Sequence, residues 1–227
     1  MYIRLDEIET CPMEGCTRTL KRNLLRSEYL DIDQTILKGS GVAEDYGIAQ
    51  SDRVEYVLDG EASLWLEGTE TEILPGHLLV VPRGAPWGKG LSVKSDVLTL
   101  LGIARRADEG GADLPAGASE KVSLRVVRPE DVPPYEPAGH AKTVNRCLFQ
   151  NDHMEVIEGA IAAGGGAEQH RHNEHEQMLY VLEGSERPLL IYYPRGTPHG
   201  TGGGISVPLK LLVIYAPPLG EALNALK

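Results

Sequence analysis

Three histidines and a glutamine in the second half of the chain have the residue types and the spacing of metal ligands. Residues 164–177 read GGGAEQHRHNEHEQ. On a β-strand, side chains two residues apart project from the same face, so His170 and His172 would hold their imidazoles about 6–7 Å apart, close enough to share one ion. The next strand would bring Glu176 or Gln177 as a third ligand, and His199 could supply a fourth. The segment therefore predicts a metal site.

Two acidic side chains beside these ligands are candidates for catalysis. Glu168 would project from the same strand face as His170, where it could act as a general base or as a further ligand. Glu176 is either an alternative ligand to Gln177 or a residue that faces solvent. We interpret His140, which is isolated in the sequence, as a structural residue.

The segments that carry these residues belong to an internal repeat. Residues 22–60 match residues 146–184 at an offset of 124, without a gap. Further along, PRGAPWG at 82–88 matches PRGTPHG at 194–200 at an offset of 112, with five of the seven residues identical. We infer a tandem duplication, in which each copy is one structural unit.

The first copy lacks every one of the expected ligands. Its residues at the positions of His170, His172, Gln177 and His199 are, in that order, Tyr46, Ile48, Arg53 and Trp87. The surrounding Gly, Pro and Tyr-Val-Leu residues are nevertheless shared by both copies. Purely structural histidines would have no reason to differ as a set, so we expect metal binding in the second copy alone.

The pattern of both copies predicts an all-β protein. Short runs rich in apolar and β-branched residues, such as 29–36 and 154–161, alternate with turns that use many of the 26 glycines and 15 prolines. Two β-units of about 100 residues fit sandwiches or barrels. We expect domains at 1–104 and 122–227, joined by a linker over 105–121, and a short amphipathic helix over 219–227.

The two offsets differ by twelve residues, which is the length of one hairpin. Residues 64–75 of the first copy have the pattern of two strands and a turn, and their counterparts between Gly184 and Pro194 are missing. Either the second copy has lost this hairpin, or a mobile hairpin is absent from the sequence. The unpaired sheet edges that a loss would leave favour the second explanation.

Composition excludes several classes of function. The formal net charge of −11 argues against nucleic-acid binding, which depends on basic patches. No apolar run approaches the roughly 18 residues of a membrane span, and the first residues lack the pattern of a signal peptide. Three cysteines are too few for a disulfide framework, and we interpret them as reduced thiols. We therefore expect a cytoplasmic protein without a nucleic-acid or membrane partner.

The second copy resembles the cupin superfamily. The first cupin motif, G-x5-H-x-H-x3/4-E-x6-G, matches Gly164, His170, His172 and Gly184, with Gln177 in the glutamate position. The second motif, G-x5-P-x-G-x2-H-x3-N, matches at its proline, second glycine and histidine, which are Pro194, Gly196 and His199. Glutamine in place of glutamate departs from the pattern and leaves the site less negative.

The resemblance and the duplication together imply a bicupin, with two tandem jelly-roll barrels of the double-stranded β-helix type. They imply a divalent metal on His170, His172, Gln177 and His199, with Fe(II) favoured and Mn, Ni or Zn as alternatives. A small organic molecule would be the substrate, and we expect a homodimer. The leading hypothesis is an Fe(II)-type dioxygenase. The alternatives are an isomerase or lyase that uses the metal as a Lewis acid, and a non-enzymatic binding protein.

Overall fold

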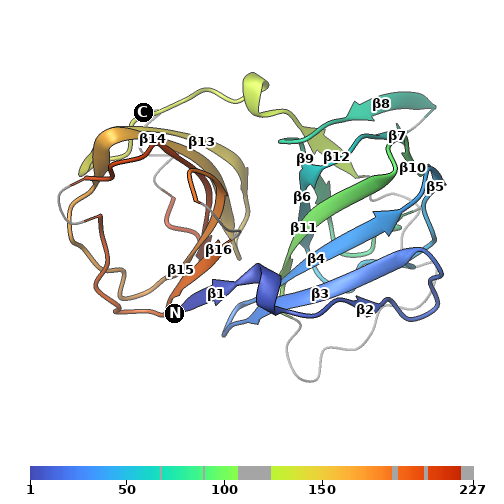
Figure 1. Ribbon diagram of the computed structural model, residues 1–227, viewed down its shortest axis with the longest axis horizontal. Helices are drawn as coiled ribbons and strands as arrows, with labels where there is room; N and C mark the ends of the chain where they lie inside the picture. The colour runs from blue at the N-terminus through green and yellow to red at the C-terminus, as the bar shows by residue number, and fades with distance from the viewer. Residues whose placement is uncertain (67, 89, 107–123, 186–188, 202–203, 221–227) are drawn as a thin grey trace. The chain divides into compact units, whose positions relative to one another are not determined.

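The computed structural model describes residues 1–66, 68–88, 90–106, 124–185, 189–201 and 204–220. The chain forms two compact units. We call Ile8–Arg128 the N-terminal unit, and Met1–Glu7 together with Pro129–Lys227 the C-terminal unit. Both are built from β-strands (Figure 1). This confirms the all-β expectation.

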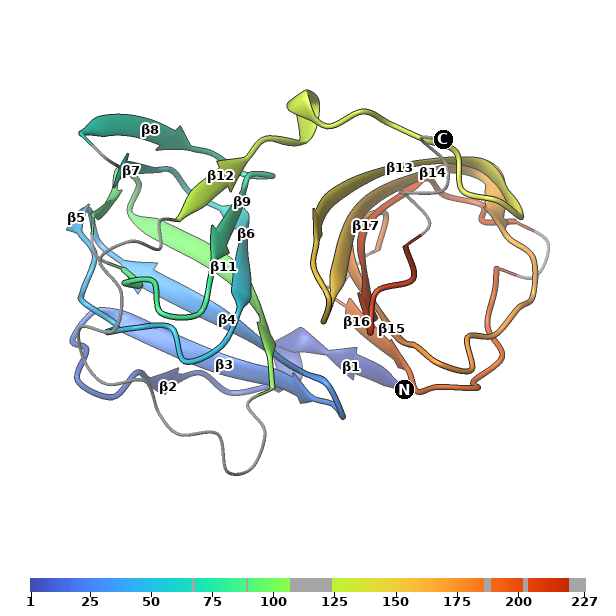
Figure 2. The same ribbon diagram turned by 180° about the vertical axis from the view of Figure 1, so that it is seen from behind.

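The C-terminal unit contains one six-stranded sheet, whose strands curl round a common axis (Figure 2). Every pairing in the sheet is antiparallel, and the strand order is β1-β16-β15-β17-β14-β13. The bounds are β1 Tyr2–Arg4, β13 His140–Gln150, β14 Glu155–Ala167, β15 Glu176–Glu183, β16 Leu189–Tyr193 and β17 Leu209–Ala216, with short 3-10 helices η1 at Leu5–Glu7 and η2 at Pro129–Asp131.

The N-terminal unit contains two sheets, of seven and four strands. The larger has the order β12-β9-β6-β11-β4-β3-β2 and the smaller β5-β10-β7-β8. A core of buried aliphatic side chains and Trp87 fills this unit. The bounds are β2 Cys11–Pro12, β3 Thr19–Arg26, β4 Leu30–Lys38, β5 Gly41–Val42, β6 Arg53–Asp59, β7 Ala62–Leu66, β8 Thr69–Ile73, β9 Leu78–Val81, β10 Leu91–Val93, β11 Val97–Arg105 and β12 Arg125–Val127.

The two units exchange their short leading strands. Strand β1, at the start of the chain, pairs with β16 of the C-terminal unit, whereas β12 pairs with β9 of the N-terminal unit. Each short strand covers a sheet edge that would otherwise expose unpaired backbone groups. The unit boundaries therefore differ from the expected division at 104 and 122, since residues 1–7 and 124–128 lie in the opposite units. Most of the expected linker, 105–121, lies outside the described residues.

The hairpin counted as missing from the second copy is β7–β8 of the N-terminal unit. There, β6 pairs directly with β9, and β7–β8 belongs to the smaller sheet. In the C-terminal unit β15 likewise pairs directly with β16 and, on its other side, with β17. The six-stranded sheet of the C-terminal unit therefore leaves β15 with a neighbour on both sides without the hairpin, whose partner in the N-terminal unit is β10 of the smaller sheet.

Two further expectations concern the ends of the chain and membranes. The helix expected over 219–227 falls almost entirely outside the described residues, which stop at Gly220. Within the residues that are described, no helix has the length and apolar character needed to cross a membrane.

Candidate metal centre

The C-terminal unit brings three histidines together. The ligand nitrogens of His170, His172 and His199 all lie within 4.8 Å of one another, and theirs is the one such group found among the described residues. His170 and His199 form an isolated antiparallel bridge, with N···O distances of 2.8 and 2.9 Å in the two directions. This bridge joins two loop segments, so backbone hydrogen bonds fix the separation of the two imidazoles.

Hydrogen bonds of two imidazoles, those of His170 and His199, leave the other nitrogen of each ring free to bind an ion. Nδ1 of His170 lies 2.7 Å from the carbonyl oxygen of Glu168, and Nδ1 of His199 lies 2.9 Å from that of Thr197. A carbonyl oxygen can only accept a hydrogen bond, so the proton of each neutral ring sits on Nδ1. Nε2 of each ring then carries a free lone pair, as in histidines that bind metals.

Three buried atoms at this centre have no hydrogen-bond partner within the part of the chain that the structure describes. They are Nε2 of His172, Nε2 of His199 and Oε1 of Gln177. A buried polar atom without a partner costs about 1–3 kcal/mol, and native structures contain few of them. All three are electron-pair donors, so a divalent cation would satisfy them together. The residues present therefore fit a metal ion.

The environment also favours the uncharged form of two of the imidazoles, those of His172 and His199. Burial, followed by the neighbouring His170 and His199, lowers the pKa of His172 to about 4. Burial likewise lowers the pKa of His199. Neutral imidazole is the form that binds a metal, so these ligands need no deprotonation at neutral pH.

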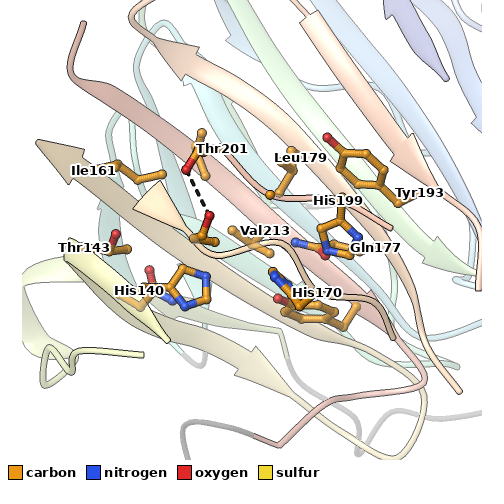
Figure 3. A pocket seen from close by; sticks show the side chains of 15 residues that line it. His140, Thr143, Ile161, His170, Gln177, Leu179, Tyr193, His199, Thr201 and Val213 are labelled. Carbon is orange, nitrogen blue, oxygen red and sulfur yellow. Dashed lines mark hydrogen bonds between the residues drawn. The ribbon is translucent and has the colours of Figure 1, made fainter. Parts of the chain in front are cut away.

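A cavity of about 90 Å³ opens beside the histidines (Figure 3). Tyr193 stacks on His199, with ring centroids 4.5 Å apart. The ring of Tyr215 meets His172 edge-on at 5.3 Å. The remaining walls come largely from three strands and include Thr143, Asn145, Leu179, Leu211 and Val213. The cavity has room for an ion and a ligand of fewer than about ten non-hydrogen atoms.

No protein-family model matches the chain, and no curated protein matches it in sequence. Solved structures do match. An oxalate decarboxylase from Lactobacillus farciminis, in complex with formate, has a TM-score of 0.66 at 14% identity over 96% of this chain and 86% of its own. An oxalate decarboxylase from Bacillus subtilis has a TM-score of 0.66 at 13% identity, over 96% of this chain and 76% of its own. A cupin 2 conserved barrel domain protein from Leptotrichia buccalis has a TM-score of 0.62 at 14% identity, over 95% of this chain and 96% of its own.

The fold is the cupin fold. At these identities the likeness shows the architecture and nothing finer.

Of the two residues weighed as the third ligand of the cupin site, the structure brings Gln177 to the cavity. Gln177 is buried and lines the wall beside His170. Glu176 is also buried, but its carboxylate accepts a hydrogen bond of 2.9 Å from the hydroxyl of Tyr192 and does not line the cavity. Adjacent residues of a strand face opposite sides, so only one of the pair can reach the cupin interior.

Glu168 lies outside the cupin cavity, contrary to the expectation that it shares a face with His170. Strand β14 ends at Ala167, so the two-residue alternation does not continue through 168–172. The side chain of Glu168 is exposed, and its contribution to the site is the backbone carbonyl that holds His170. The catalytic role expected for Glu168 therefore has no support in this arrangement.

Sequence reasoning missed His140, which does line the cavity. Its ring centroid lies 5.9 Å from that of His170 (Figure 3). Strand β13 pairs His140 with Ala167, which brings it next to a segment 30 residues away in the chain. The interpretation of His140 as an isolated residue failed because strand pairing, and not spacing, places it. A hairpin pairing of 140–150 with 155–167, which was not among the expectations from the sequence, would have located it.

In the N-terminal unit, protein side chains occupy the positions that match the ligands in sequence. The rings of Tyr46 and Trp87, which match His170 and His199, lie 5.9 Å apart. The guanidinium of Arg53, which matches Gln177, lies over Trp87 at 5.7 Å from its ring centroid. A protein-borne cation and two large aromatic rings thus stand where the C-terminal unit has its ligands.

Arg53 belongs to a buried network of charges inside the N-terminal unit. It forms an ion pair with Glu55 and lies 3.6 Å from Asp33, which in turn pairs with Lys21 at 3.0 Å. A Cβ atom at Gly102 would come within 2.7 Å of both Arg53 and Asp33, so the missing side chain makes room for the network.

The matching row of the C-terminal unit is apolar. In the N-terminal unit, Gly102 of β11 pairs with Asp33 of β4 on one side and with Glu55 of β6 on the other. In the C-terminal unit, Val213 of β17 likewise pairs with Ile157 of β14 and with Leu179 of β15. This row therefore carries paired charges in the N-terminal unit and apolar side chains in the C-terminal unit.

The buried carboxylate of Glu55 gives a testable dependence of stability on pH. Burial raises the pKa of Glu55 to about 7 from an ordinary 4.5, opposed by Arg53 and reinforced by Asp33. Between these values the folded protein binds a proton that the unfolded chain does not, so the free energy of unfolding should fall as pH rises from about 4.5 to about 7. A shift of this size corresponds to at most about 3 kcal/mol.

We expect Glu55→Gln to remove this contribution, which urea titrations of both proteins at a series of pH values would measure. All other titrating groups are common to the two proteins, so the difference between their profiles isolates Glu55. Parallel profiles would contradict the assignment.

Proposed function

We propose that the C-terminal unit is a metal-dependent cupin enzyme that acts on a small organic molecule chelated at the metal. One observation carries the proposal: three buried electron-pair donors, on His172, His199 and Gln177, have no partner among the described residues. They converge beside a cavity large enough for a small ligand. We propose further that the two units descend from one duplicated cupin domain.

The donor set determines what kind of chemistry fits. Three neutral imidazoles and an amide oxygen contribute no negative charge, so the ion would keep its full positive charge toward the substrate. When bound, such an ion supplies Lewis-acid polarisation of chelating oxygen atoms or, for a redox-active metal such as Fe(II), electrons for reaction with O2. We propose Fe(II), with Mn, Ni and Zn as alternatives.

The protein's own residues orient the ligands and exclude water. The carbonyl groups of Glu168 and Thr197 hold two imidazoles in position, and Tyr193 packs over His199. The apolar walls formed by Leu179, Leu211 and Val213 suit an electron-rich chelate, such as an enediol or a β-diketone, whose reactive intermediates must be kept from water.

We propose oxygen-dependent cleavage of the substrate, in which both O2 atoms enter the products, as the reaction. A second candidate is metal-assisted lyase chemistry without O2, and it is favoured by the naming of two structurally similar proteins as oxalate decarboxylases.

Elemental analysis of protein purified without chelators tests the metal site. We expect about one divalent ion per chain. Protein loaded with that ion is then incubated with catechol, acetylacetone and oxalate, in air and under argon. Uptake of O2 with product formation supports the dioxygenase, and turnover under argon supports the lyase. Saturable binding with no turnover in either atmosphere contradicts an enzymatic function, and a chain that binds no metal contradicts the whole proposal.

A further inference from the structure

The side chain of Asn145 is a further polar group in the wall of the metal cavity. Asn145 lies on β13, lines the cavity and is 7% exposed. Its backbone N–H and C=O both bond to Tyr135, at 2.8 and 2.9 Å. Its side-chain amide can both donate and accept a hydrogen bond, so Asn145 offers a polar contact to a ligand in the cavity.

The neighbouring strand leaves space for this amide. Asn145 pairs with Gly159 of β14, and a Cβ atom at Gly159 would lie 2.9 Å from the side-chain oxygen of Asn145. The backbone of Gly159 does not have a positive φ, so the glycine is not needed for a turn. Its lack of a side chain instead gives the amide of Asn145 room beside the cavity.

The strand register places Asn145 apart from the metal ligands. Gln177 pairs with Tyr215 on β17, Leu179 pairs with Val213, and Gly159 pairs with Leu211. Because Asn145 pairs with Gly159, it lies level with Leu211 of β17. Gln177 lies level with Tyr215, four residues further along β17, which is two side chains along the same face. The apolar Leu179–Val213 row lies between them. Along the cavity, the metal ligands therefore lie at one end, Leu179 and Val213 form an apolar middle, and the amide of Asn145 lies at the other end.

The cavity walls carry no fixed charge. None of the residues that line the cavity is an aspartate, glutamate, lysine or arginine. The negative chelating oxygens of the ligand would face the proposed metal ion, so a second charge at the far end of the ligand would have no counter-charge among the residues that line the cavity, which is unfavourable. The group that meets Asn145 must therefore be polar and uncharged.

We propose that Asn145 is a specificity-determining residue that hydrogen-bonds the end of the substrate remote from the metal. The substrate is then a compact molecule with two chelating oxygen atoms at one end, a short apolar body, and an uncharged hydroxyl or carbonyl group at the other end. This inference rests on the proposed metal site and goes beyond it by naming the class of substrate.

The test uses the full chain loaded with Co(II), whose absorption spectrum reports on ligand binding. Three hydroxamic acids share a chelating group and differ at the far end: butanohydroxamic acid, its 4-hydroxy derivative, and succinic monohydroxamic acid. We expect the hydroxyl probe to bind about tenfold more tightly than the methyl probe, the factor that corresponds to one hydrogen bond. The carboxylate probe should bind most weakly of the three.

The variant Asn145→Leu should bind Co(II) with unchanged stoichiometry and lose the preference for the hydroxyl probe. The control Asn23→Leu changes an exposed asparagine on β3 of the other unit and should keep the preference. A preference that survives in Asn145→Leu, or a carboxylate probe that binds best to the native chain, would overturn the proposal. Loss of Co(II) from the native protein would instead overturn the proposed metal site, so the two failures are distinguishable.

A second variant covers the case in which Asn145→Leu fails to fold. Asn145→Asp keeps the shape of the side chain and adds a negative charge. We expect this variant to bind the carboxylate probe at least a further tenfold more weakly, relative to the methyl probe, than the native chain does. Two like charges would then meet in a buried site. An unchanged ratio of these two affinities would show that Asn145 does not face the bound probe.

Discussion

His170→Ala protein should purify with almost no bound metal, whereas Tyr46→Ala protein should keep the metal content of the native chain. His170 supplies one of only three imidazoles in the group, and its nitrogen lies within 4.8 Å of the other two ligand nitrogens. Loss of an outer partner of a ligand already weakens metal binding by roughly 10–100-fold, and loss of a ligand itself should weaken it more. Metal-dependent turnover should disappear with the metal.

Tyr46 is a matched control because it occupies the corresponding position of the N-terminal unit, where it hydrogen-bonds Thr19 at 2.9 Å. Its removal leaves a cavity in that unit and should lower the melting temperature without changing the metal content. Elemental analysis of both variants, purified side by side, is the measurement. Stoichiometric metal in His170→Ala would show that the ligand set is wrong.

Arg53→Met should destabilise the protein by about 3–5 kcal/mol, the usual cost of removing one partner from a buried ion pair. The substitution leaves the carboxylates of Glu55 and Asp33 buried beside each other, with Lys21 as the nearby cation that still pairs with Asp33. Glu55 is fully buried, so water cannot replace the lost partner. The midpoint of urea unfolding should fall accordingly.

The exposed ion pair of Arg26 and Asp31, in the same sheet, provides the control. Its atoms are 3.6 Å apart and both side chains are largely in water, so Arg26→Met should cost no more than about 1 kcal/mol. Adding Glu55→Gln to Arg53→Met should restore part of the stability, because one of the stranded charges is removed. Equal losses in Arg53→Met and Arg26→Met would show that the buried network contributes no more than a surface pair.

Strand segments could be predicted from the sequence because apolar and β-branched residues recur between turns. The expected strands at 29–36 and 154–161 correspond to β4 and β14. The exchange of β1 and β12 between the units could not be predicted in this way. Short strands of three residues carry little pattern, and only the open edges of β16 and β9 determine where they pair.

The candidate site was predictable where the chain itself brings residues close, and not elsewhere. His170 and His172 are neighbours in sequence, and the expected next strand and the cupin motifs added Gln177 and His199. Glu168 was wrongly placed because the strand ends at Ala167, a boundary that composition does not mark. His140 and Asn145 were missed because antiparallel pairing of β13 with β14, and not local spacing, brings them to the cavity.

By itself, the sequence determined the kind of chemistry available to this protein: three histidines and a glutamine in one copy, replaced as a set in the other. Local residue types and their spacing are enough for that, because a metal selects its ligands by chemistry. Only the tertiary structure decided which neighbouring residues share the cavity. It separates Gln177 from Glu176 on opposite faces of β15 and sets the uncharged amide of Asn145 two rows along β17 from the ligands. Strand register is the physical reason, since a shift of one residue exchanges every inward side chain for an outward one.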